Sequence, residues 1–466
     1  MKNFIFIFLL SLISFHAECQ EKEIAYKINR QLKVNNQKTG LNYPGSVKRF
    51  YEAIDCQPAW VKPQNGMGKT WEAMLMLDCV LQFGLAHKDY HVNELSYERL
   101  HIMLEQPEKI HADEKARFDI MLTDAMITFM NHLHYGKFNP DYPPERIDMG
   151  NGIPLLADEK LRSAMLENDL MTAVLDVQPK NKAYKDLQLF MHLVKGQYTG
   201  DCYEVPEADV RLAAINMERL RWAAFGDIPY LHINIPSFTL KLCETDSVYN
   251  FKIIVGKPGH PTPTLQSAIG YFTTAPDWKV PQELFVEELL PLALKQNNYF
   301  NDNKYTVYDQ VGNSVDLSNA KLKEISKHPS AYSLRQSSGQ DQSSGAVVFL
   351  FPNNFDIYLH DSPDQRQFNG ADFAMSYGNI EVERATDLAA LLLKYDGAQE
   401  QILKLRKNAA KYIRSNFILK SPLPIRVTYI TCAYKDGRLL RYPDIYSLDD
   451  RLQRKLYNLS DQLVLK

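Results

Sequence analysis

Two segments decide how this chain folds: Tyr358-Leu359-His360-Asp361 and Ser376-Tyr377-Gly378-Asn379-Ile380-Glu381. Strand-like runs at 346–351 and 356–359 lead into the first segment, so His360 is expected at the end of a strand. Asn379 follows His360 by 19 positions. An imidazole is suited to take a proton from a nucleophile, but a carboxamide has no proton that an imidazole could remove. The pair therefore offers a base without a nucleophile.

Together with Phe351-Pro352-Asn353, these segments resemble the active-site signature of the L,D-transpeptidases, cysteine enzymes that cross-link bacterial peptidoglycan. In that family, a His in a Tyr-Leu-His-Asp strand is followed 19 positions later by the Cys of a Ser-X-Gly-Cys-Ile/Val-Arg motif. The resemblance implies that His360 occupies the position of the base and Asn379 that of the nucleophile. It further implies that Gly378 and the amide of residue 379 form an anion-binding corner.

The same resemblance assigns three more residues to substrate binding: Tyr358, Ser376 and Arg335. Arg335-Gln336 matches an Arg-Gln pair that precedes a Pro-Gly-rich loop in the family, although the loop at 337–345 has no proline. Ser376 is the remaining hydroxyl in the motif, but it lies three residues before the nucleophile position.

The chemistry of the family depends on the residue that is missing. A Cys–His pair works because a thiol with a pKa near ~8.5 readily becomes a thiolate, and Asn379 cannot form the thioester. Loss of the nucleophile alone costs roughly 10⁶ in turnover in a well-studied serine protease. Glu381 stands where the family has Arg, and Tyr377 where it has His or Ser. These departures predict the fold of the family without its activity.

Composition places the 466-residue chain among globular proteins of two or three domains, with 45% hydrophobic and 11% aromatic residues. A net charge of −3 gives no field that would attract nucleic acid or anionic lipid, and no nucleic-acid partner is expected. The cysteines and histidines form no zinc-like cluster, so neither a metal nor a cofactor is expected.

The first 19 residues are typical of an export signal. Lys2 supplies the positive end, Phe4 to Phe15 an apolar run, and Ala17-Glu18-Cys19 a small-X-small cleavage site. A permanent anchor and lipidation of Cys19 are the alternatives, the first disfavoured by the length of the run and the second by Glu18. The rest of the chain has no segment of membrane-spanning length, so the mature protein is expected in the periplasm without a transmembrane segment.

The predicted fold is α+β, with an α-helical N-terminal scaffold domain followed by a mostly β L,D-transpeptidase-like domain that carries an inserted helical lid. Apolar residues recur at helical spacing up to about residue 194, and strand-like alternation begins at Tyr230. Several phrases of the first half, such as Gly136-Lys137-Phe138-Asn139-Pro140, resemble the scaffold of the long, multidomain Gram-negative members. The peptidoglycan-binding module that usually follows that scaffold is missing here. We expect these boundaries: 1–19 signal peptide, 20–200 scaffold domain, 201–229 linker and helix, 230–450 L,D-transpeptidase-like domain with its lid at 281–333, and 451–466 C-terminal tail.

Five cysteines remain after the expected cleavage: Cys56, Cys79, Cys202, Cys243 and Cys432. An odd number leaves at least one thiol unpaired, and the pairing of the others stays open. Cys432, in the strand-like run 427–434, is the one candidate for a displaced nucleophile, since we expect it in the same domain as His360.

The sequence therefore favours a non-catalytic member of the family that binds a peptidoglycan stem peptide or an envelope protein. Two alternatives remain: an active L,D-transpeptidase with an unrecognised nucleophile, and a structural scaffold of the cell envelope.

Overall fold

The structure is a computed structural model and describes residues 20–33, 40–61, 68–195, 206–223, 225, 229–296, 298–339 and 345–457. The expected export signal, Cys19 and Cys202 lie outside these ranges. The chain divides into two compact units, which are described separately. The first unit contains the residues up to Phe225 with 432–441 and 448–466, and the second contains 226–431 with 442–447.

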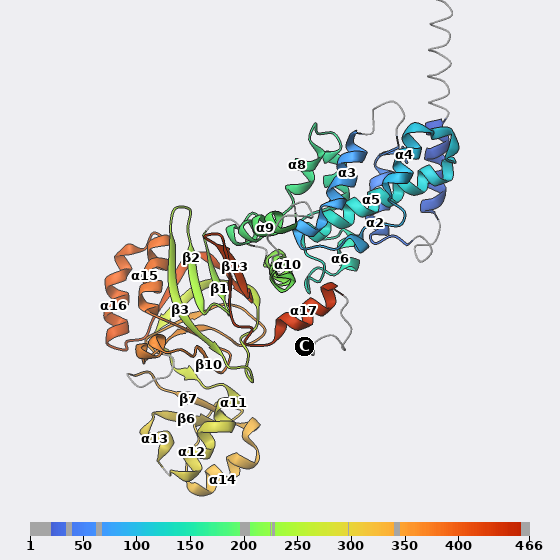
Figure 1. Cartoon of the computed structure of the whole chain (residues 1–466). Helices are drawn as coiled ribbons and strands as arrows, with labels where there is room; N and C mark the ends of the chain where they lie inside the picture. The colour runs from blue at the N-terminus through green and yellow to red at the C-terminus, as the bar shows by residue number, and fades with distance from the viewer. Residues whose placement is uncertain are drawn as a thin grey trace, which may run out of the picture. The chain divides into compact units, whose positions relative to one another are not determined.

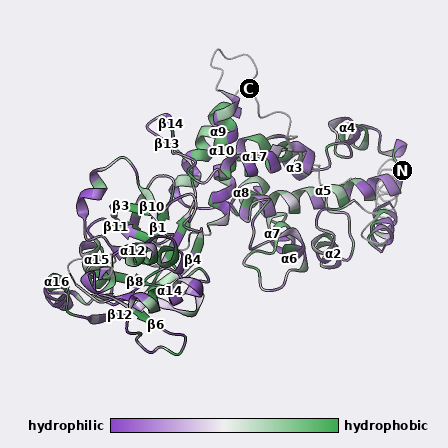
Figure 2. Ribbon diagram, turned by 90° about the horizontal axis from the view of Figure 1, so that it is seen from below, coloured by the Kyte–Doolittle hydropathy of each residue, from purple (hydrophilic) through white to green (hydrophobic). Residues whose placement is uncertain are grey.

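The first unit is helical (Figure 1). After a helix at 20–32, its helices are α2 (Pro44–Glu52), α3 (Gly68–Asp78), η2 (Val80–Phe83), η3 (His87–Asp89), α4 (Tyr97–Glu105), η4 (Pro107–Lys109), α5 (Ala112–His134), α6 (Pro144–Met149), α7 (Ala157–Ala164), α8 (Leu170–Leu175), α9 (Lys182–Lys195) and α10 (Glu207–Trp222). Hydrophobic and hydrophilic residues are interspersed along these helices (Figure 2), as expected for helices that bury one face.

The 23-residue helix α5 is the centre of this unit, and most of its side chains are buried. Two of its carboxylates hold neighbouring loops. Asp119 accepts hydrogen bonds from the amides of residues 59–61 and from the hydroxyl of Tyr51, at 2.6 Å. Asp124 accepts the amides of residues 42 and 43. Buried carboxylates are tolerated here because backbone donors satisfy them.

The end of the chain returns to the first unit. The hairpin of β13 (Cys432–Lys435) and β14 (Arg438–Arg441) packs against α9 and α10, and α17 (Leu448–Tyr457) packs against α10. Arg219 of α10 donates a hydrogen bond to Asp449 of α17 at 2.5 Å. The stretch that we expected to be a tail from residue 451 thus includes most of a packed helix.

The second unit is built on a nine-stranded sheet with the order β10-β3-β11-β9-β8-β4-β12-β1-β2. A further β3–β2 pairing joins the two ends of this series. The strands are β1 (Tyr230–Asn234), β2 (Thr239–Cys243), β3 (Val248–Gly256), β4 (Leu265–Thr274), β8 (Val347–Leu350), β9 (Leu359–Asp361), β10 (Ala374–Ser376), β11 (Ile380–Val382) and β12 (Ser415–Thr428).

Alternating apolar residues explain these strands and their common core. Leu231 and Ile233 of β1 and Leu240 and Leu242 of β2 are all buried, while the residues between them are less so. The helices α15 (Ala385–Tyr395) and α16 (Ile402–Ala410) cover the sheet at β8, β9 and β4 and contribute to the same core. Two short helices complete this part, η7 (Gln365–Asn369) and η8 (Gln399–Gln401).

The lid segment, residues 278–336, has a core of its own around Phe285, Phe300 and Ile325. It contains a three-stranded sheet with the order β5-β7-β6, so it is not purely helical as the sequence suggested. Its elements are β5 (Trp278–Lys279), α11 (Gln282–Leu284), the π-helix η5 (Phe285–Leu289), α12 (Leu290–Lys295), α13 (Tyr299–Asp302), β6 (Tyr305–Tyr308), α14 (Asn319–Lys327), η6 (Pro329–Ala331) and β7 (Ser333–Gln336).

The predicted α+β class is confirmed: a helical scaffold precedes a β-rich domain. Within the described ranges, none of the helices combines the length and hydropathy that crossing a membrane requires.

Candidate functional site

A cleft with a volume of about 1020 Å³ lies in the second unit. One wall comes from the lid segment and the two residues before it, at 276–283, 308–312, 330–333 and 335. The other comes from the main sheet and its loops, at 348, 350–353 and 355–358, together with Tyr377 and Asn379. Of the six site residues expected from the sequence, Tyr358, Asn379 and Arg335 line this cleft, whereas His360, Gly378 and Ser376 are not among the residues that line it.

Strand pairing explains why residues 19 positions apart meet. β9 and β11 pair in parallel, with Leu359 opposite Ile380 and His360 opposite Glu381. Asn379 directly precedes β11, so it lies beside Tyr358, and its Oδ1 accepts the Tyr358 amide at 3.2 Å. The side chain at the nucleophile position is therefore an acceptor for the start of β9, and it is 7% exposed.

Tyr358 links Asn379 to the lid segment. Its hydroxyl accepts a hydrogen bond from Trp278 Nε1 at 2.7 Å, and it also contacts the Asn379 side chain. Burial raises the pKa of Tyr358 to about 12, so the phenol stays protonated at neutral pH and can donate. Asn379, Tyr358 and Trp278 thus form a polar chain across one end of the cleft, and none of them offers a nucleophile.

His360 is buried, at 6% exposure, and its Nδ1 lies 2.7 Å from the carbonyl oxygen of Asp361. Because a carbonyl only accepts, Nδ1 carries the proton and Nε2 is the nitrogen free to accept one. The tautomer is the one that a general base would need at Nε2. Within the described ranges, however, neither nitrogen contacts residue 379 or another side chain that could be activated.

The turn before Asn379 depends on Gly378, whose φ of +96° favours glycine. Thr262 fixes this turn by donating its hydroxyl to the Gly378 carbonyl at 2.8 Å. Ser376 donates its hydroxyl to the Asn379 carbonyl at 2.5 Å. In the described part of the chain, the amides of residues 378 and 379 donate to no protein acceptor, and of these two residues Asn379 lines the cleft.

A cluster of five residues, named the latch below, joins the lid segment to the loops around Gly378: Lys257, His260, Glu287, Glu288 and Tyr377. The Tyr377 hydroxyl donates to Glu288, and Lys257 Nζ lies 3.8 Å from the centre of the Tyr377 ring. His260 Nε2 is 3.4 Å from Glu287, and the centre of its ring lies 4.6 Å from that of Tyr377, with the two planes tilted by 35°. No sequence pattern indicates this cluster, because the carboxylates of η5 have the spacing of a solvated helix.

The described cysteines are free and offer no substitute thiol near His360. The expectation that Cys432 shares a domain with His360 is wrong, because β12 ends at Thr428 and β13 belongs to the first unit. Cys432 is 1% exposed there, and burial raises the pKa of its thiol to about 12. Cys243, on β2, is the described cysteine of the second unit, and burial raises its pKa too. Raised pKa values oppose the thiolate that acyl transfer needs.

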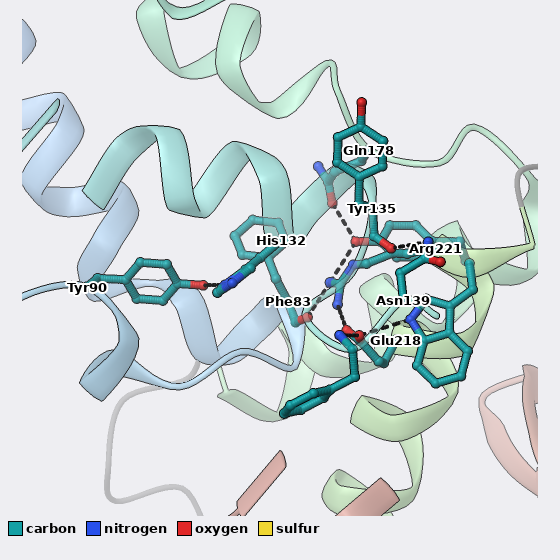
Figure 3. Close-up of polar contacts among 11 residues, drawn as sticks. Phe83, Tyr90, His132, Tyr135, Asn139, Gln178, Glu218 and Arg221 are labelled. Carbon is teal, nitrogen blue, oxygen red and sulfur yellow. Dashed lines mark hydrogen bonds and ion pairs between the residues drawn. The ribbon is translucent and has the colours of Figure 1, made fainter. Parts of the chain in front are cut away.

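A second cluster of buried charges lies in the first unit, where its members hydrogen-bond one another and nearby backbone groups (Figure 3), although the buried Arg221 Nε has no hydrogen-bond partner among the described residues. The side chains of Glu218 and Arg221 are completely buried, 3.4 Å apart. Glu218 also accepts the amide of Phe138 at 2.7 Å, and Arg221 donates to the Phe83 carbonyl and the Tyr184 hydroxyl. These contacts fasten α10 to η2, to α9 and to the loop after α5, which is a structural role.

Comparison with known proteins finds a matching domain in each of the two units. Residues 45–191 match the model of a scaffold domain, and residues 228–401 match that of the L,D-transpeptidase catalytic domain. The chain belongs to the L,D-transpeptidase family. A protein of Haemophilus influenzae that carries the name "Putative L,D-transpeptidase" is 32% identical over 249 residues. The match covers 51% of this chain and 48% of that protein, so the chain spans about half the length of this curated relative.

The roles expected of His360 and Asn379 stay predictions; in the structure His360 lies on β9 and Asn379 directly precedes β11. The sequence does not indicate that the Asn379 side chain accepts a hydrogen bond from the Tyr358 backbone amide. The two residues meet only because β9 and β11 pair.

Proposed function

We propose that this L,D-transpeptidase family member binds peptidoglycan stem peptides in its cleft without cross-linking them, in the periplasm. The observation that carries the proposal is Asn379: an amide at the nucleophile position holds the Tyr358 amide, beside a cleft of about 1020 Å³. A stem peptide offers carbonyl and carboxylate groups that the amide of residue 379, which lines the cleft, can bind. Without a thiol or an activated hydroxyl at that point, no acyl-enzyme forms.

Incubation of the purified protein with disaccharide-tetrapeptides tests this proposal. We expect saturable binding by calorimetry and no cross-linked dimer by mass spectrometry, with a Cys-containing family member as positive control. Formation of a dimer at a rate near that of the control would contradict the proposal and favour the active alternative. Absence of binding would instead favour a scaffold or a protein partner.

Treatment with a carbapenem separates the same alternatives by a second route. Carbapenems acylate the working members of the family through their thiol. We expect the intact mass of this protein to stay unchanged, while the Cys-containing control gains one drug molecule. A stoichiometric adduct on this chain, located by peptide mapping, would identify an unrecognised nucleophile.

A further inference from the structure

Two cations face each other across the lid sheet without a counterion. Lys279 of β5 lies directly opposite Arg335 of β7 in the antiparallel register. Both are exposed and both line the cleft, whereas the neighbouring Trp278 and Leu334 point into the core of the lid segment. β6 and β7, which belong to the same small sheet, are visible in Figure 1. Because side chains alternate along a strand, the register places both cations on the same face of this sheet.

Like charges directly opposite each other on paired strands repel, so this arrangement costs the free protein stability. The protein does not compensate the pair. Within the described ranges, no carboxylate oxygen lies within 4.0 Å of either cation. Arg335 instead packs its guanidinium over the ring of Tyr308, which also lines the cleft, at 4.9 Å from the ring centre.

The carboxylates of the cleft are used elsewhere or lie apart from the pair. Asp309 accepts the amides of Val311 and Asn313, at 2.9 and 2.8 Å, and so closes its own loop. Asp277 lies 3.6 Å from Arg414. Glu283 and Asp356 also line the cleft but form no ion pair with Lys279 or Arg335. The two cations are therefore the uncompensated positive charge of this cleft.

We propose that Lys279 and Arg335 form a carboxylate subsite, which holds a free carboxylate of a peptide that lies in the cleft. This inference rests on the proposed function and names the ligand group that the lid segment recognises. A guanidinium binds a carboxylate through two parallel hydrogen bonds, and an adjacent ammonium adds a third donor and a second charge. Binding of the anion removes the repulsion between the cations, so the subsite gains most from a ligand that carries a negative charge.

The experiment compares a disaccharide-tetrapeptide with the same compound amidated at its C-terminal carboxyl group. We expect the unchanged protein to bind the free acid at least tenfold more tightly than the amide. The double variant Lys279→Gln/Arg335→Gln should bind both compounds equally, with the affinity that the unchanged protein has for the amide. A double variant of two exposed lysines of α14, Lys323→Gln/Lys327→Gln, removes the same charge outside the cleft and should keep the preference.

The outcomes distinguish the subsite from the proposed function. If the unchanged protein binds neither compound, the proposed function and the subsite both fail. If it binds both compounds equally, or if the cleft variant keeps the preference for the acid, the subsite is wrong while peptide binding stands. Thermal unfolding checks that the cleft variant is folded, and its midpoint should not fall, since the substitutions remove a repulsion.

Discussion

Asn379 lines the cleft, and its side chain accepts a hydrogen bond from the backbone. Its Oδ1 accepts the backbone amide of Tyr358, the residue before β9, and through Tyr358 it is linked to Trp278 of the lid segment. A cysteine has no carbonyl oxygen and could not make the same contact with the Tyr358 amide. Relative to the motif that the sequence resembles, Asn379 therefore provides a structural hydrogen bond in place of a thiol.

Replacement of Asn379 by Ala should reduce the free energy of unfolding by about 1–2 kcal/mol, because the buried Tyr358 amide loses its acceptor. Urea unfolding of the two proteins measures the difference. Asn416→Ala, at an exposed position of β12, is the matched control and should change stability by less than about 0.5 kcal/mol. Equal stability of the Asn379 variant and the unchanged protein would show that the hydrogen bond contributes nothing.

His132 makes the stability of the helical unit dependent on pH. Its side chain is buried beside the Tyr90 hydroxyl (Figure 3), and burial lowers its pKa from 6.5 to about 3. In the unfolded chain the imidazole takes up a proton below about pH 6.5, whereas the folded chain resists this until about pH 3. The contribution of the neutral His132 side chain to the free energy of unfolding is therefore complete above about pH 6.5. As the pH falls below that value, the free energy of unfolding decreases by up to about 1.4 kcal/mol per pH unit.

A His132→Gln variant, which can still hydrogen-bond Tyr90, should therefore be less sensitive to acid. Relative to the unchanged protein, it should gain about 2 kcal/mol of unfolding free energy between pH 7 and pH 5. Urea unfolding at several pH values, followed by circular dichroism, gives this difference. His101→Gln, at an exposed position of α4, should show no such gain. If the difference in unfolding free energy between the His132 variant and the unchanged protein does not vary with pH, this prediction is wrong.

The lid segment has a hydrophobic core of its own, and the latch connects it to the loops around Gly378. η5 contributes Glu287 and Glu288, and the extra residue in a π-helical turn changes the direction of side chains relative to an α-helix. The latch residues are largely exposed, and exposed ion pairs contribute little to global stability. Their effect should be local, on how often η5 separates from Tyr377.

The double variant Glu287→Gln/Glu288→Gln should increase amide exchange in residues 285–290 several-fold and leave the midpoint of thermal unfolding within about 2 °C. Hydrogen exchange with mass spectrometry measures the first quantity and calorimetry the second. Lys321 and Glu324, an exposed pair on α14, provide the control: Glu324→Gln should not alter exchange in η5. Unchanged exchange in the latch variant would show that the core of the lid segment alone positions η5.

The first unit is built from two parts of the chain, the first 225 residues and segments near the C-terminus. β12 ends the main sheet at Thr428, and the residues after it supply a hairpin and a helix to the unit in which the chain began. The buried guanidinium of Arg219, at 6% exposure, depends in part on Asp449. The first 225 residues therefore lack part of their own packing when they are separated from the C-terminal segment.

Replacement of Asp449 by Ala should destabilise the first unit by about 2 kcal/mol, since a hydrogen bond to a buried charged group is lost. Urea unfolding, combined with proteolysis of the helical region, measures the effect. Asp450→Ala is the control, because its partner Arg454 lies one turn away on an exposed face, and it should cost less than about 0.5 kcal/mol. Equal effects of the two substitutions would contradict the role of α17.

The α+β class, the helical first half, the family and the absence of a thiol at position 379 can all be predicted from the amino-acid sequence. Each of these depends on local patterns: helical spacing, strand alternation, and a motif with a fixed spacing between His360 and Asn379. The same reasoning placed Tyr358 and Arg335 at the cleft, where the structure also has them.

Features that depend on contacts between distant residues could not be predicted from local sequence patterns. The cation pair of Lys279 and Arg335 follows from a strand register that joins positions 56 residues apart. Cys432 belongs to the first unit because β13 packs against α9 and α10, and no local sequence pattern indicates this packing. Local spacing fixes which face of a strand or helix a side chain lies on, but the partner of that face is chosen by the packing of the complete chain.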